Sequence, residues 1–207
     1  MGTLDKGVRV LGAVEEAGPC TLADLVATTG FSRATAHRLA VALEAHGLLR
    51  RTAGGRFALG LRLVGLGRAA ADGLPLADAA GPALAALREA TGESVQLYIR
   101  QGDQRVCVAS LESPHGLRTI VPMGAALPLD RGSAGRVLRT APDGWVESIE
   151  ERERGVASVS AAVRGPSGEV LAAVGVSGPV ERTTHAPGAR YGAAVEAAAH
   201  AIEAALR

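Results

Sequence analysis

Residues 21–60, TLADLVATTGFSRATAHRLAVALEAHGLLRRTAGGRFALG, decide the fold of the N-terminal part of the chain. Apolar residues recur at helical spacing within this stretch and predict helices over residues 22–28 and 33–45. Thr21 and Ser32 stand where N-cap residues are expected, and a glycine lies in the short turn between the helices. A short helix, a glycine turn and a capped second helix together predict a helix-turn-helix.

The second of these helices has one apolar face and one polar face. Its apolar stripe is expected to pack inward, and the opposite face carries short polar or long cationic side chains near the N-terminal end. A recognition helix places its contacts with the DNA major groove there. The candidate DNA contacts are Arg33, Ala34, Thr35, His37 and Arg38, together with the caps Thr21 and Ser32.

A β-hairpin is expected directly after this helix, and a further helix over residues 5–16 is expected before it. Residues 48–51 and 56–59 read as strands around a Gly-Gly turn, which makes the unit a winged helix-turn-helix. The wing arginines Arg50, Arg51 and Arg56 would lie along the phosphate backbone and add affinity rather than sequence choice. The alternative is a plain structural domain whose arginines are merely solvated.

Charge is distributed unevenly along the 207 residues. Residues 1–68 carry nine Lys or Arg and five Asp or Glu, a net +4, whereas the remainder carries 13 and 16, a net −3. A basic module that binds a polyanion, joined to a different domain, fits this asymmetry. Cys20 and Cys107 match no metal or redox spacing, and no signal peptide or membrane span is apparent, so we expect a cytoplasmic protein in which the cysteines are reduced.

The second part of the chain mixes helices and strands. Helices are predicted over residues 61–71 and 76–90, with a break at Gly73-Leu74-Pro75. The hydrophobic period then changes to two, which predicts strands over 95–99, 105–111, 118–121, 158–164 and 169–177, the last two joined by a hairpin at 165–168, before a final helix over 191–206. This pattern predicts an α+β domain.

Residues 21–67 resemble the N-terminal domain of the IclR family of bacterial regulators. The resemblance rests on the Ser-x-x-Thr-x-x-Arg-Leu run that begins at Ser32, the step His46-Gly47-Leu48, and the wing ending at residues 56–60. It implies that Ala34, Thr35 and Arg38 touch bases of double-stranded operator DNA, with Arg33 and His37 flanking them. A repressor or an activator is therefore expected.

The remainder of the chain resembles the IclR effector domain, a GAF-like sheet with helices on one face. The matching segments are residues 90–94, 127–136, 151–158 and 172–179, and they look closest to a subgroup tied to amino-acid biosynthesis. The resemblance implies a DNA-binding domain over residues 1–60, a linker helix over 61–74 that helps form a homodimer or tetramer, and an effector-binding and oligomerisation domain over 75–207.

The resemblance also implies a pocket for a small organic acid or an amino-acid-like effector. Its expected positions are Leu127, Ser133, Ala134, Ser148, Val156, Ser158, Gly175 and Ser177. A helix start at Ser133-Ala134 offers free N–H groups to an anion, and serine hydroxyls both donate and accept hydrogen bonds. At any single position, the small residue could equally serve close packing.

Two departures from the family pattern concern this pocket. Relatives continue the helix after residues 135–138 and add a further helical stretch, whereas here only residues 139–143 precede Gly144-Trp145. Ser148 also stands where some relatives carry a carboxylate, and Gly175 where a hydroxyl is common. The pocket is therefore expected to be more open, differently selective or lost, and the alternative is a regulator whose shortened C-terminal domain only oligomerises.

An enzyme is not expected. The sequence contains no nucleophile elbow, P-loop, metal-ligand cluster or Rossmann fingerprint, and no cofactor is implied. Glu150, Glu151 and Glu153 form a crowded acidic run, which is more typical of a solvated face than of a catalytic site.

Overall fold

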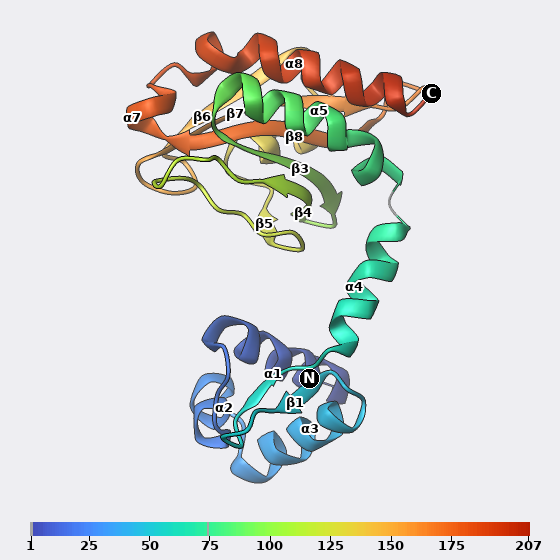
Figure 1. The fold of residues 1–207 in the computed structure, drawn as a ribbon, viewed down its shortest axis with the longest axis vertical. Coiled ribbons are helices and arrows are strands. Elements are labelled where there is room, and N and C mark those ends of the chain that lie inside the picture. The colour runs from blue at the N-terminus through green and yellow to red at the C-terminus, as the bar shows by residue number, and fades with distance from the viewer. Residues whose placement is uncertain (1, 74) are drawn as a thin grey trace. The chain divides into compact units, whose positions relative to one another are not determined.

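The computed structural model describes residues 2–73 and 75–207 (Figure 1). The chain divides into two compact units, Met1–Gly73 and Leu74–Arg207. The predicted break at Gly73-Leu74-Pro75 includes Leu74, which lies outside the described residues. The helices on either side of it are α4, Arg62–Asp72, and α5, Pro75–Thr91.

The N-terminal unit has the predicted order of helices and strands. It contains α1 (Thr3–Ala17), α2 (Leu22–Thr29), α3 (Arg33–Ala45), β1 (Leu49–Arg51), β2 (Phe57–Leu59) and α4. Thr21 caps α2 by accepting a hydrogen bond from the Asp24 amide at 3.2 Å, and Ser32 caps α3 in the same way from Thr35 at 3.3 Å. Gly30 between them has φ +68°, the left-handed conformation that favours glycine. Both caps and the antiparallel hairpin β1–β2 are confirmed.

Apolar side chains from all three leading helices and from the hairpin form one core. Val10, Leu25, Leu39 and Leu49 are buried in it, and Phe57 is 1% exposed at its centre. The backbone of Phe57 also exchanges two hydrogen bonds with Cys20, of 2.9 and 2.8 Å, which tie the wing to the loop after α1. The wing is therefore held against the helices by packing and by backbone pairing together.

The C-terminal unit is built on an antiparallel sheet whose described strands run in the order β5-β4-β3-β8-β7-β6. The strands and the remaining helices are β3 (Ser94–Gln101), β4 (Gln104–Leu111), β5 (Ala126–Pro128), α6 (Ser133–Thr140), β6 (Trp145–Ile149), β7 (Val156–Arg164), β8 (Val170–Pro179), α7 (Val180–Thr183) and α8 (Pro187–Ala205). The unit is α+β, as expected.

The predicted strand over residues 118–121 is wrong, because this segment forms no strand in the structure. Two of its backbone carbonyls accept from side chains instead: the Ser94 hydroxyl donates to the Thr119 carbonyl at 2.6 Å, and the Cys107 thiol donates to the Val121 carbonyl at 3.9 Å. The short edge strands β5 and β6 were not found by the strand pattern of the sequence.

Helices lie on both faces of the sheet, so the expectation that they cover one face is wrong. In Figure 1, α5 and α8 pack together on one face, where Leu84 and Ile202 are buried. The other face is covered by α6, whose Val137 packs in a second core with Tyr98. Successive strand residues point to opposite faces, and Leu97 and Tyr98 are both buried, so β3 needs cover on each side.

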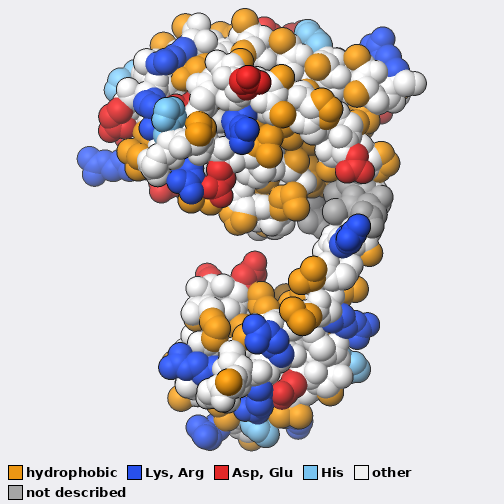
Figure 2. Space-filling model, in the orientation of Figure 1, with side chains coloured by type: hydrophobic (Ala, Val, Ile, Leu, Met, Phe, Trp, Pro, Cys, Tyr) orange, Lys and Arg blue, Asp and Glu red, His pale blue; other side chains and the backbone are white. Residues whose placement is uncertain are grey.

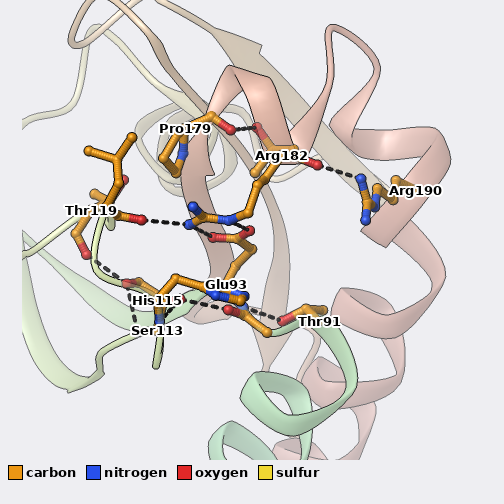
Figure 3. Close-up of polar contacts among 12 residues, drawn as sticks. Thr91, Glu93, Ser113, His115, Thr119, Pro179, Arg182 and Arg190 are labelled. Carbon is orange, nitrogen blue, oxygen red and sulfur yellow. Dashed lines mark hydrogen bonds and ion pairs between the residues drawn. The ribbon is translucent and has the colours of Figure 1, made fainter.

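A buried ion pair fastens α7 to the start of β3 (Figure 3). Glu93 is 2% exposed, and both of its carboxylate oxygens accept from Arg182, at 2.7 and 2.9 Å. Arg182 also donates to the Leu117 carbonyl at 2.8 Å, so one guanidinium joins α7, β3 and the loop between β4 and β5. Bidentate pairs of this kind fix geometry as well as charge.

Candidate functional site

The polar face of α3 points away from the core of the N-terminal unit. Arg33, Ala34, His37 and Arg38 are exposed and Thr35 is half-buried, whereas Ala36, Leu39 and Ala40 are buried. Basic side chains are visible over this unit in Figure 2. A helix with short and cationic side chains on its free N-terminal face has the shape and charge to enter a DNA major groove.

The caps and two of the three wing arginines, Arg51 and Arg56, already have partners inside the N-terminal unit. The Thr21 hydroxyl donates to the Asp24 carboxylate at 2.8 Å, and the Ser32 hydroxyl donates to Thr35 at 3.0 Å. Arg51 pairs with Glu44 at 3.3 Å and lies 4.3 Å from the centre of the Phe57 ring.

Arg50 and Arg56 are exposed on the wing, and Arg56 donates to the Pro19 carbonyl at 3.2 Å. Of the three wing arginines, Arg51 is thus the one most engaged by its own unit, and Arg50 and Arg56 are better placed to meet a phosphate.

The C-terminal unit contains a cavity of about 30 Å³ on the face of the sheet covered by α6. Seven of the eight expected effector positions line it. These are Ser133, Ala134, Ser148, Val156, Ser158, Gly175 and Ser177. Leu127 does not line it; this side chain packs instead against the core around Tyr98 and Cys107.

Serine hydroxyls form a connected group inside this pocket. The Ser133 hydroxyl lies 2.8 Å from the hydroxyls of both Ser158 and Ser160. The Ser177 hydroxyl donates to the Gln96 side-chain oxygen at 3.0 Å, which leaves the buried Gln96 Nε2 without a partner among the described residues. The pocket therefore has an amide donor that no described protein group satisfies.

Sequence reasoning missed seven residues of the lining. They are Gln96, Tyr98, Arg105, Gly132, Arg152, Ser160 and Val176. The sequence could have indicated Arg105, because it lies two positions before Cys107 in β4 and the two side chains therefore point to the same, inward face of the strand. It is 3% exposed, and Cys107 is 1% exposed. A charged residue at an inward strand position is rarely accidental.

Burial shifts the pKa values of two groups beside the pocket. It raises the pKa of Tyr98 to about 12, so the phenol is neutral at physiological pH. Burial also lowers the pKa of the Arg105 guanidinium, which lies 5.4 Å from the Tyr98 ring centre. Arginine starts so far above neutrality that Arg105 keeps its positive charge.

Gly175 is explained by how closely β7 approaches it. A Cβ atom at this position would lie 2.3 Å from the Ser160 hydroxyl and 2.6 Å from the Val159 carbonyl oxygen. At this position, where a hydroxyl is common in the family, the space is already filled by Ser160, which supplies a hydroxyl from the neighbouring strand.

The short connection between α6 and β6 is held at both ends by contacts with other elements. Ala141 ends α6 in the left-handed conformation, with φ +48°, and its carbonyl accepts from Arg164 at 3.0 Å. Trp145, the first residue of β6, lies directly against Gly188 and Gly192 of α8. The strand is therefore anchored on the helix by an indole ring packed over a glycine surface.

We expect the substitution Gly192→Ala to loosen this anchor. A Cβ atom there would lie 2.4 Å from the Trp145 indole nitrogen, so the ring must shift, and overpacking of this kind costs about 1–3 kcal/mol. Urea unfolding followed by the fluorescence of Trp145, the only tryptophan, measures the change. Ala189→Gly, one turn away on exposed α8 surface, serves as the control for helix propensity. An unchanged unfolding midpoint for Gly192→Ala would contradict the packing described.

A winged helix-turn-helix followed by a sheet domain with an internal polar pocket defines the class of two-domain bacterial transcription regulators. The IclR helix-turn-helix domain model matches residues 3–53, and the model for the bacterial transcriptional regulator IclR C-terminal domain matches 68–143 and 138–204. The chain belongs to the IclR family. The two C-terminal pieces overlap at 138–143, which covers the last three residues of α6 and most of the short connection to β6.

Curated relatives include regulators from several bacteria. The HTH-type transcriptional regulator KipR of Bacillus subtilis is 31% identical over 65% of this chain, and the match spans 54% of that protein, about half its length. The HTH-type transcriptional repressor AllR of Salmonella typhi is 24% identical over 87% of this chain and 81% of its own length. The relatives are transcriptional regulators and not enzymes.

Solved structures share the fold over nearly the whole chain. The Thermotoga maritima IclR is 21% identical with a TM-score of 0.77, covering 99% of this chain and 98% of that one. An IclR homologue from Microbacterium hydrocarbonoxydans, complexed with 4-hydroxybenzoate, is 20% identical with a TM-score of 0.81, covering 100% of this chain and 99% of that one.

None of the helices in the described residues combines the length and apolar character needed to cross a bilayer.

Proposed function

We propose that this chain is a cytoplasmic repressor that binds operator DNA through α3 and the wing and is controlled by a small organic acid or amino-acid-like effector in the pocket beside α6. The single observation that carries the DNA-binding part is the outward face of α3, where Arg33, Ala34, His37 and Arg38 are exposed. The effector would shift the equilibrium between two states of the protein that differ in operator affinity. The size of the shift is set by the difference between the effector's affinities for the two states. Genes of amino-acid or related metabolism are the proposed targets.

Three domain roles are assigned along the chain. The DNA-binding domain is assigned to residues 1–60, the linker helix to 61–74 and the effector-binding, GAF-like domain to 75–207. Base contacts are assigned to Ala34, Thr35 and Arg38, and phosphate contacts to Arg50, Arg56 and the flanking residues of α3. The caps Thr21 and Ser32, which stand at helix N-termini, are also assigned contacts with the DNA backbone.

A homodimer is proposed because α1 and α4 expose large apolar side chains. Leu4 and Val8 are 80% and 59% exposed on α1, and Val64 is 70% exposed on α4, with Leu61 just before it at 76%. Exposed apolar side chains along a helix mark protein–protein contacts when they gather, and a two-fold operator requires two recognition helices.

We expect the double substitution Leu61→Ser, Val64→Asp to raise the concentration at which the homodimer dissociates by about tenfold or more, since the pair contributes apolar burial of a few kcal/mol. Light scattering across a dilution series measures it. Leu117→Asp removes an equally exposed leucine, 69%, from the C-terminal unit and should leave dissociation unchanged. Equal effects of the two variants, or none, would count against this interface.

The small volume of the pocket favours one alternative, a DNA-binding regulator whose C-terminal domain binds no ligand. A cavity of about 30 Å³ holds only a few heavy atoms in this conformation. The two proposals separate in a single experiment. Operator DNA is first selected from genomic fragments, and anisotropy then measures its release by small acids and amino acids. Salt-sensitive, sequence-dependent binding supports the regulator, and release by a small molecule supports the effector role.

A further inference from the structure

The first residue of α4 carries a charge that its own helix does not favour. Arg62 begins α4, and the N-terminal end of a helix is positively polarised, so a cation there is unfavourable. Its partner lies on another helix: the Arg62 guanidinium donates to the carbonyl of His46, the C-cap of α3, at 3.1 Å. The C-terminal end of a helix favours a cation, and its last carbonyls have no partner within the helix. Arg62 therefore joins the start of α4 to the end of α3.

The backbone holds the same two helices together. Gly47 follows α3 with φ +70°, and the Leu48 amide donates back to the Leu43 carbonyl at 2.9 Å. The Gly60 amide, just before α4, donates in turn to the Leu48 carbonyl at 2.9 Å. A Cβ atom at Gly60 would lie 2.6 Å from the Gly47 carbonyl carbon, so the two segments touch through their backbones. The start of α4 is thus fixed against the end of α3.

Packing along its length does little to orient α4 within the N-terminal unit. Over residues 62–70, Leu63 is half-buried and the other residues are exposed. The core of this unit is formed by the three leading helices and the hairpin, and among the described residues it contains no side chain of α4. The angle between α4 and α3 therefore depends on the contacts at the first turn of α4, where Arg62 lies.

We infer that Arg62 sets the spacing of the operator half-sites that the protein accepts, by holding α3 at a fixed angle to α4. This inference rests on the proposed DNA-binding function and on the proposed homodimer. In that homodimer α4 joins the two protomers and each α3 reads one half-site, so the angle between α3 and α4 sets the separation of the two recognition helices. A two-fold protein binds half-sites at a separation that matches its own geometry. Arg62 acts through α3 and is therefore a positioning residue.

The test measures the affinity for operator DNA as the spacing of its half-sites changes. Fluorescence anisotropy compares the full chain on the selected operator, on versions with one or two base pairs inserted or removed between the half-sites, and on a duplex with a single half-site. Each base pair moves the second half-site by about 3.4 Å and rotates it by about 35°. We expect the wild-type protein to prefer the natural spacing by at least about tenfold.

The variant Arg62→Met removes the charge and the donor and keeps an apolar chain. We expect it to lower the preference for the natural spacing by about threefold to tenfold, the range for losing one hydrogen bond. The single half-site should be bound as the wild type binds it, because the outward face of α3 is unchanged. Arg62→Lys keeps a charged donor and should retain most of the preference.

Arg68→Met changes another exposed arginine of α4 and is the matched control, which should keep the wild-type preference. If Arg62→Met does not fold, Arg62→Gln, which is uncharged and shorter, should lower the preference in the same direction.

The outcomes separate this inference from the proposed function. If the wild-type protein shows no sequence-dependent binding, both are overturned. If it binds the operator but tolerates altered spacing, or if Arg62→Met keeps the wild-type preference, the DNA-binding function stands and the role of Arg62 is wrong. If Arg62→Met weakens the single half-site and the operator by the same factor, Arg62 supports the fold of the N-terminal unit and does not set the spacing.

Discussion

The substitution Arg38→Ala is expected to weaken binding of the selected operator by about tenfold to a hundredfold, because a bidentate contact from arginine to a base is worth about 1–3 kcal/mol. Arg38 is exposed on the free face of α3, whereas the neighbouring Leu39 is buried, so the substitution removes a contact and leaves the core intact. Fluorescence anisotropy with operator and scrambled duplexes measures the loss. The affinity for the scrambled duplex should change much less.

Arg50→Ala on the wing is the comparison that separates base contacts from phosphate contacts. Losing one phosphate contact should weaken both duplexes alike and reduce the slope of log affinity against log salt by about one. Arg68→Ala, an exposed arginine of α4, should alter neither. If Arg38→Ala and Arg50→Ala behave identically on both duplexes, α3 does not read sequence.

The substitution Arg182→Met is expected to destabilise the C-terminal unit by about 3 kcal/mol, because it leaves the Glu93 carboxylate buried without its cation. Glu93 is 2% exposed, and Arg182 is the cation that holds both of its oxygens. Trp145 is the only tryptophan and lies in this unit, so its fluorescence reports the unfolding of this unit without a signal from the other. The unfolding midpoint in urea should fall accordingly.

An exposed ion pair in the same unit provides the matched control. Arg118 binds Glu112 at 2.6 Å, but their side chains are 33% and 47% exposed. Surface pairs contribute about 1 kcal/mol or less, so Arg118→Met should shift the midpoint much less than Arg182→Met. Equal shifts of the unfolding midpoint would mean that the Glu93–Arg182 pair (Figure 3) stabilises the fold no more than an exposed ion pair does.

The N-terminal unit could be predicted from the sequence because its determinants are local. The Thr21 and Ser32 caps, the positive φ of Gly30 and the turn between β1 and β2 each depend on residues within a few positions of one another. The exposed face of α3 followed from helical periodicity alone. The sequence did not show which arginines already have partners, because the pairing of Arg51 with Glu44 depends on how the wing folds back on α3.

The C-terminal unit was harder to predict because its determinants are distant in the sequence. Residues 118–121 resemble a strand, yet side chains from β3 and β4 donate to the carbonyls of Thr119 and Val121. The placement of α6 on the second face depends on the burial of both Leu97 and Tyr98. Family motifs located seven pocket residues, but Arg105 comes from a strand outside those motifs, and only the folded sheet brings it to the start of α6.

Directed cleavage of operator DNA from a reagent on α3 tests the central claim most directly. Cys20 and Cys107 are buried, so a Val41→Cys variant, at an exposed position of α3 outside the assigned DNA contacts, offers one accessible thiol for an iron chelate that cuts nearby DNA. The account predicts cleavage at defined positions within the operator, repeated about one helical turn apart if two recognition helices bind. No cleavage, or the same cleavage from a chelate placed on α5 at an Arg88→Cys variant, would contradict it.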